Sequence, residues 1–194
     1  MSQREPLPVY NVGVIVGSLS EKSINRHLFH ALTALGPEAQ LSLMEIPIAD
    51  LKVYSRDFDA DYPAEARALK SAIEASDAII LITPEYNRSL PGSLKNAIDW
   101  ASRPWGTNSF NGKPSAVIGT SPGKTGTAMA QAHLRSILSH LGSPELRQPE
   151  AFIQNTPGLF GENGEISDET VAEFLLNWLK AVHTHTARSL TPVQ

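Results

Sequence analysis

Apolar segments of two kinds alternate along the whole chain, and this alternation constrains the fold more than any other feature. Short aliphatic or β-branched runs predict strands, and longer stretches with apolar residues at helical spacing predict helices. The predicted strands cover residues 9–16, 41–46, 78–82, 115–119 and about 146–153. The predicted helices carry apolar stripes within residues 24–35, 66–73, 94–101, 130–141 and 171–182. Pro149 restricts the fifth strand to a sheet edge or an irregular segment.

Strict alternation of strands and helices predicts a parallel sheet with helices on both faces. The continuously apolar run Ala78–Ile82 is typical of a strand in the centre of such a sheet. Five strands and five helices in 194 residues predict one α/β domain over residues 1–194, a flavodoxin-like three-layer sandwich with strand order 2-1-3-4-5. Ligands bind at the carboxyl ends of the strands in such sheets, which directs attention to the loops after the first, third and fourth strands.

Composition excludes several classes of function. The net charge is −4 without a basic cluster, which disfavours nucleic acids and anionic membranes as partners. The absence of cysteine excludes disulfides, thiolate metal sites and a cysteine nucleophile. The six histidines lack an accompanying set of carboxylates, so no metal site is expected. The longest aliphatic run is too short to cross a bilayer and the first residues do not resemble a signal peptide, so we expect a soluble, cytoplasmic protein.

The loop after the first strand, Gly17–Arg26, has the features of an anion site. It combines a glycine, the hydroxyls of Ser18, Ser20 and Ser23, and the start of a helix. Free N–H groups and the helix dipole favour a phosphate there. The alternative is a serine-rich helix cap, with Ser23 as the N-cap and no ligand.

The loop after the fourth strand, Gly119–Gly126, lacks the glycine spacing of a phosphate-binding Walker A loop. It does match the nucleophile elbow of serine hydrolases, with Ser121 as the nucleophile. That class uses the backbone N–H of the following residue, and Pro122 has none. A serine hydrolase therefore remains only a weak alternative, and a loop that wraps a ligand with its backbone is favoured.

The loop after the third strand is bracketed by Pro84 and Pro91 and contains Tyr86 and Asn87. A rigid turn with an aromatic ring and an amide suits a flat heteroaromatic ligand. The alternative is that Tyr86 covers the core at the surface and Asn87 is a turn residue.

Several segments together resemble the family of NAD(P)H-dependent FMN reductases, which includes bacterial quinone and chromate reductases. The resemblance spans about residues 9 to 155, and its most specific part is the long motif after the third strand. The matching residues are Pro84-Glu-Tyr-Asn87, Pro91-Gly92, Leu94–Trp100, Ser102-Arg-Pro104, Gly17-Ser-Leu19, Ser23, Asn25, Arg26, Thr120–Gly123, Gly126, Ala130 and Gln131.

The resemblance implies a bound FMN, a hydride donor that is NADPH or NADH, and a small electron acceptor such as a quinone, chromate or free flavin. The flavin would carry the chemistry, so no catalytic side chain is expected. The phosphate would be held by the first loop, the isoalloxazine flanked by the second and closed by the third. The residues concerned are Gly17, Ser18, Ser20, Ser23, Ile24 and Asn25; Pro84, Glu85, Tyr86 and Asn87; and Thr120, Ser121 and Gly123.

Two further expectations follow from the resemblance. Reductases of this family usually have arginine where this chain has Ser20, so a positive charge is missing near the phosphate loop. Lys22, two residues further on, is the candidate replacement, but its point charge on a flexible side chain fixes geometry less well than a guanidinium. A homodimer or homotetramer is expected. Separately from the resemblance, Asn96 and Trp100 lie off the Leu94/Ile98 stripe of their helix, which predicts that this face packs against another subunit; the alternative is burial against a neighbouring loop. A non-enzymatic flavin electron carrier is the main alternative function, although a net charge of only −4 argues mildly against it.

Overall fold

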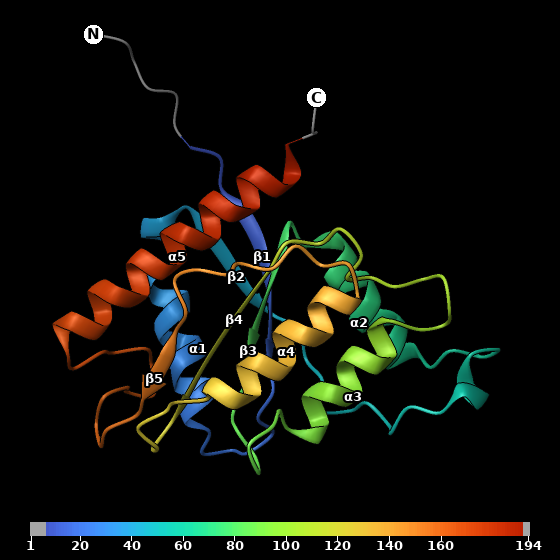
Figure 1. Cartoon of the computed structure of the whole chain (residues 1–194), viewed down its shortest axis with the longest axis horizontal. Helices are drawn as coiled ribbons and strands as arrows, with labels where there is room; N and C mark the ends of the chain where they lie inside the picture. Colours follow the sequence, from blue (N-terminus) through green and yellow to red (C-terminus); the bar gives the residue numbers. More distant parts are fainter. Residues whose placement is uncertain (1–6, 192–194) are drawn as a thin grey trace, which may run out of the picture.

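A computed structural model describes residues 7–191, and its elements confirm the predicted alternation (Figure 1). The strands are β1 (Tyr10–Val16), β2 (Leu41–Glu45), β3 (Ala78–Ile82), β4 (Ser115–Ser121) and β5 (Phe152–Gln154). The helices are α1 (Ile24–Leu35), α2 (Ala64–Ala75), α3 (Gly92–Ala101), α4 (Ala128–His140) and α5 (Glu169–Leu190). Two short 3₁₀ helices cover Gly36–Ala39 and Arg56–Phe58. Within the described residues, no helix is long and apolar enough to cross a membrane.

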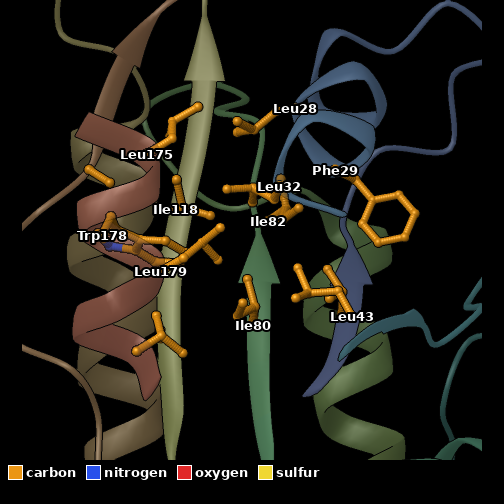
Figure 2. Packing of buried hydrophobic residues seen from close by; sticks show 14 of the residues in the cluster. Leu28, Phe29, Leu32, Leu43, Ile80, Ile82, Ile118, Leu175, Trp178 and Leu179 are labelled. Atoms are coloured by element: carbon orange, nitrogen blue, oxygen red, sulfur yellow. The ribbon is translucent and has the colours of Figure 1, made fainter. Parts of the chain in front are cut away.

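All five strands are parallel and lie in the order β2-β1-β3-β4-β5, which confirms the flavodoxin-like topology. Side chains alternate between the two faces of the sheet, so each face has its own apolar core. On β3, Ile80 and Ile82 pack with α1 and α5, whereas Ile79 and Leu81 pack with α2, α3 and α4. Figure 2 shows the first of these cores, where Leu28 and Leu32 of α1 and Leu175 and Trp178 of α5 meet at the sheet. The three layers are therefore those that the sequence predicts.

The fifth strand is shorter than predicted. It covers only Phe152–Gln154 at the edge of the sheet, and residues 146–151 are not part of it. Pro149 lies in the excluded part and has no N–H to donate to β4. The sequence signal located the strand but not its start.

The Asn96/Trp100 face of α3 is covered by the chain itself, so the prediction of a subunit interface there is wrong and the alternative, burial against a neighbouring loop, is confirmed. The long loop 46–63 between β2 and α2 lies over it. The Trp100 indole donates to the carbonyl of Lys52 (2.6 Å), and the Asn96 side-chain oxygen accepts from the Tyr54 backbone N–H (2.9 Å). Trp100 is only 1% exposed and also contacts the rings of Tyr54, Phe58 and Tyr62. The polar atoms of this face are therefore satisfied within one chain.

Candidate functional site

The three predicted loops converge on one cavity at the carboxyl ends of β1, β3 and β4, at the lower end of the sheet in Figure 1. Its volume is about 210 Å³. Gly17, Asn87 and Gly123 lie in the same loops but do not line it, whereas Lys22 and Pro122 do. The lining residues are Ser18, Ser20, Lys22, Ser23, Ile24, Asn25, Pro84, Glu85, Tyr86, Thr120, Ser121 and Pro122.

The start of α1 presents unpaired donors to this cavity. Ser23 is the N-cap, as predicted, and its Oγ accepts from the N–H of Arg26 (3.3 Å). The N–H groups of Ile24 and Asn25 have no hydrogen-bond partner within residues 7–191. Two free N–H groups at the positive end of a helix dipole fit an anion such as a phosphate.

The basic side chains near this loop are not equivalent. Arg26 points to β2, where its Nη1 lies 2.8 Å from Oε2 of Glu45. This hydrogen bond raises the pKa of Arg26, against a smaller opposing effect of burial. Lys22 lines the cavity and Arg26 does not, so Lys22 is the basic residue of this loop that would contact an anion placed there. The sequence indicated Lys22 only as a replacement for the missing arginine, because nothing in the sequence shows where Arg26 points.

The side chain of Asn25 is committed to protein contacts. Its Oδ1 accepts from the N–H of Thr120 and its Nδ2 donates to the carbonyl of Thr120, both at 3.0 Å. Asn25 and Thr120 are 2% and 1% exposed. The backbone N–H of Asn25 therefore remains available to a phosphate, while its side chain joins two loops of the site.

The β3–α3 loop (residues 83–91) is anchored on α4. Oε2 of Glu85 accepts from the N–H groups of Met129 (3.0 Å) and Ala130 (3.2 Å). Asn87 and Arg88 then form a tight turn with φ of 51° and 62°. The carboxylate of Glu85 is thus part of the helix start, and Asn87 is a turn residue.

The ring of Tyr86 lies at the mouth of the cavity. Tyr86 precedes the tight turn, which is closed by backbone hydrogen bonds between Tyr86 and Ser89 in both directions (2.9 and 3.0 Å). Its side chain nevertheless stays open to solvent, because the residue is 54% exposed and lines the cavity. An exposed ring beside a polar cavity fits a planar ligand.

The loop after β4 folds on itself around Ser121. The Ser121 hydroxyl donates to the carbonyl of Gly126 (2.6 Å) and accepts from the N–H of Gly123 (3.2 Å). Among residues 7–191, no histidine is hydrogen-bonded to this hydroxyl. A serine nucleophile needs a base within hydrogen-bond reach, so the geometry does not support a hydrolase.

Gly119 allows three elements to meet beneath the cavity. A Cβ at this position would lie 2.1 Å from the carbonyl oxygen of Thr83 and 2.3 Å from Oγ1 of Thr127. Thr83 directly follows β3 and Thr127 precedes α4. Only glycine fits between them, and its lack of a side chain lets the second and third loops come together.

The site therefore offers free helix N–H groups at one end and an exposed aromatic ring at the other. The hydroxyls of Ser18 and Ser20 lie near the first end, and the polar loop after β4 forms the remaining wall. This arrangement fits an elongated ligand that has a phosphate at one end and a flat ring system at the other, as FMN does.

Comparison with known proteins gives a consistent result. Residues 10–158 match the NADPH-dependent FMN reductase family. The chain is 45% identical over 168 residues to a 2-hydroxy-1,4-benzoquinone reductase from a Burkholderia species, covering 87% of this chain and 91% of that protein. It is 44% identical over 163 residues to a quinone reductase from Pseudomonas putida, covering 84% and 87%.

Among solved structures, the flavoenzyme FerB from Paracoccus denitrificans, an NAD(P)H:(acceptor) oxidoreductase, superimposes with a TM-score of 0.88. The two sequences are 46% identical, and the match covers 93% of this chain and 98% of FerB. The similarity therefore extends over the whole sandwich, including all three loops of the cavity.

Proposed function

Because this chain belongs to the NADPH-dependent FMN reductase family, we propose that it is an FMN-dependent NAD(P)H oxidoreductase that reduces quinones or similar small acceptors. The observation that carries this proposal is the meeting of the three family loops around one cavity with free phosphate donors. Relatives at 44% and 45% identity that are named as quinone reductases support the choice of acceptor.

The residues of the cavity would divide the work of binding. The N–H groups of Ile24 and Asn25, with the hydroxyls of Ser18 and Ser20, hold the phosphate. Tyr86 and the backbone of Pro84 and Glu85 flank the ring system. Thr120, Ser121 and Pro122 line the opposite side, and the Thr120 and Ser121 hydroxyls are bonded inside the protein, so this wall contributes shape rather than free side-chain donors. Gly123 lies behind this wall and donates to the Ser121 hydroxyl.

When bound, FMN supplies the redox chemistry, accepting hydride from a nicotinamide and passing electrons to the acceptor. The chain contributes orientation and access. The exposure of Tyr86 leaves the ring-binding end of the cavity open to solvent, so a nicotinamide and an acceptor would reach it in turn. An open site of this kind favours a range of acceptors.

The test uses purified protein, apoprotein and free FMN. We expect saturable binding of one FMN per chain, followed by the change in flavin fluorescence, and oxidation of NAD(P)H that depends on an added quinone. Binding of FMN without quinone-dependent turnover would favour an electron carrier. No saturable change at micromolar protein would contradict the whole proposal.

We also propose that the protein is a dimer or tetramer. The Asn96/Trp100 face is covered, so the contact must use another surface. Trp105 is 85% exposed, with the Arg103 guanidinium 5.6 Å from the centre of its ring, and this exposed aromatic side chain fits such a contact. Light scattering should give at least twice the mass of the chain, and a monomer across the micromolar range would contradict this assignment.

A further inference from the structure

The hydrogen bonds between Asn25 and Thr120 continue the backbone hydrogen bonding of β4 beyond the point where its neighbour β3 ends. The register of β3 and β4 pairs Ile82 with Ile118, and the N–H of Thr83 donates to the carbonyl of Ile118 (2.9 Å). β3 ends at Ile82, and after Thr83 and Pro84 the chain turns away toward α4, where Glu85 is bonded. Thr120, two residues beyond Ile118, faces the same side of β4 but has no strand beside it.

The other side of β4 stays paired at this level. Thr120 is flanked by Gly119 and Ser121, which lie in register with Phe152 and Gln154 of β5. The Thr120 hydroxyl donates to the carbonyl of Ile153 (3.1 Å). On the β3 side, where that strand has already ended, the backbone N–H and carbonyl of Thr120 still need a partner, because Thr120 is buried.

Asn25 supplies that partner from the first turn of α1. An amide side chain offers one acceptor and one donor in a plane, which is the pattern that a neighbouring strand residue would present. Leaving these two backbone groups unpaired in a buried position would be costly. The amide of Asn25 therefore replaces a strand at the gap between β1 and β4.

We infer that Asn25 is a positioning residue that fixes the open start of α1 against the end of β4. This inference rests on the proposed function, in which a phosphate binds at that helix start. The Ile24 and Asn25 N–H groups belong to the same turn as the tie, so their direction relative to the Ser121–Gly126 loop depends on it. A direct phosphate contact by the Asn25 side chain is not part of this role.

Asn25→Asp is the informative variant because its behaviour depends on the protonation of the new carboxyl. The ionised carboxylate has no hydrogen to donate to the Thr120 carbonyl, and the repulsion between the two oxygens, in place of a 3.0 Å hydrogen bond, moves the side chain away from both backbone groups of Thr120. It also places a negative charge at the phosphate site. The protonated acid offers one donor and one acceptor, as the amide does. Burial and the facing Thr120 carbonyl raise the pKa of such a carboxyl, against the opposite effect of the helix start and Lys22, so the acid that re-forms the tie becomes populated as the pH falls.

The matched control is Asn108→Asp. Asn108 also joins two backbone groups, accepting from the N–H of Phe110 (3.0 Å) and donating to the carbonyl of Leu141 (2.8 Å). It lies before β4, at the opposite end of that strand from the cavity. Asn108 is half-buried, whereas Asn25 is buried, so this control reports the general effect of replacing an amide that joins two backbone groups by a carboxyl.

The first measurement is amide hydrogen exchange of the flavin-free protein at about pH 7.5, on peptides that contain Thr120. We expect faster exchange at Thr120 in Asn25→Asp and wild-type exchange there in Asn108→Asp. Unchanged exchange at Thr120 in Asn25→Asp would overturn the inference. This readout needs no flavin, so it decides the tie even if wild-type protein binds no FMN and the proposed function fails.

The second measurement is affinity for FMN and for riboflavin, which lacks the phosphate. At about pH 7.5, Asn25→Asp should weaken FMN binding by at least about tenfold. Riboflavin binding should also weaken, because the tie holds both walls of the cavity. At about pH 5.5 the FMN affinity should return to within about threefold of wild type at the same pH. Loss of FMN affinity alone, with riboflavin affinity and Thr120 exchange unchanged, would make the Asn25 side chain a direct phosphate ligand.

If Asn25→Asp does not fold at neutral pH, Asn25→Ser provides the same comparison. Serine is too short to reach both backbone groups of Thr120, so its exchange and FMN affinity should change as in Asn25→Asp. It has no carboxyl to protonate, so acid should not restore binding. Restoration by acid in Asn25→Ser would show that the pH effect does not come from the tie.

Discussion

Two helices begin at the same edge of the sheet, and the N–H groups of their first turns have opposite fates. In α4, Ala128 donates to Thr125, Gln131 donates to Thr127, and the two N–H groups between them donate to the carboxylate of Glu85. In α1, Ser23 accepts from Arg26 and His27, while Ile24 and Asn25 keep free donors. A helix start next to a cavity is therefore a ligand site only where the protein leaves it open.

The largest effect is expected from closing the open start of α1 with Ser23→Asp. Aspartate caps helices as well as serine, so the fold should be retained. Two like charges about 4 Å apart repel by about 4 kcal/mol at an effective dielectric constant of 20. We expect FMN affinity to fall by at least about a hundredfold in fluorescence titrations. Riboflavin affinity should change far less, and an equal loss for both ligands would show that the phosphate does not bind at α1.

Opening the closed start of α4 with Glu85→Ala is the reverse experiment. Two hydrogen bonds to a charged acceptor and a favourable contact with the helix dipole are lost, so the free energy of unfolding should fall by about 1.5–3 kcal/mol. Urea denaturation of the apoprotein measures this effect. Glu85→Gln keeps an acceptor without the charge, so its free energy of unfolding should lie between those of wild type and Glu85→Ala. Wild-type stability in Glu85→Ala would mean that solvent caps α4 equally well.

A smaller effect is expected from adding charge beside the open start. Ser20→Arg restores the residue that related reductases usually have, next to Lys22 at the mouth of the cavity. One partly exposed charge-assisted bond contributes about 1.5–3 kcal/mol at most, so kcat/KM for NADPH relative to NADH should rise on the order of tenfold. Steady-state kinetics with both donors tests this. An unchanged ratio would place the nicotinamide cofactor away from Ser20.

The smallest effect is expected at Arg88, the exposed residue beside the Glu85 carboxylate at the start of α4. Arg88 lies 3.8 Å from Glu85 but is largely solvated, and such pairs contribute little. Arg88→Ala should change the free energy of unfolding by less than about 0.5 kcal/mol in urea. A loss comparable to that of Glu85→Ala would mean that the ion pair, rather than the helix contact, anchors the loop.

The sequence predicted the strand order and the three loops because both depend on local patterns. A buried parallel strand such as Ala78–Ile82 and a helix cap such as Ser23 are encoded within a few residues. The contacts that assemble the site are not local. Asn25 and Thr120 lie 95 residues apart, and Glu85 lies 44 residues from Met129. No spacing rule connects such pairs, so the family resemblance predicts Asn25 and Glu85 as site residues but not what their side chains bind.

The error at Trp100 has a similar origin. Its position off the main apolar stripe of α3 was visible in the sequence, and burial was expected from it. Which surface buries it depends on the path of loop 46–63. The sequence of this loop has no hydrophobic periodicity, so its path cannot be predicted from the sequence. The acceptor for its indole N–H is the backbone carbonyl of Lys52. Every residue has such a carbonyl, so no residue type in the sequence identifies this partner.

The crowding at Gly119 determines where this enzyme can change during evolution. A side chain there would push the end of β3 away from the start of α4, and with them two walls of the cavity. Substitutions of Gly119 are therefore expected to damage the site before they can change its acceptor range. Ser20, Lys22 and Tyr86 reach the cavity from the loops above and are free to vary without moving the sheet. Directed-evolution libraries for altered acceptor range should be concentrated on these three positions.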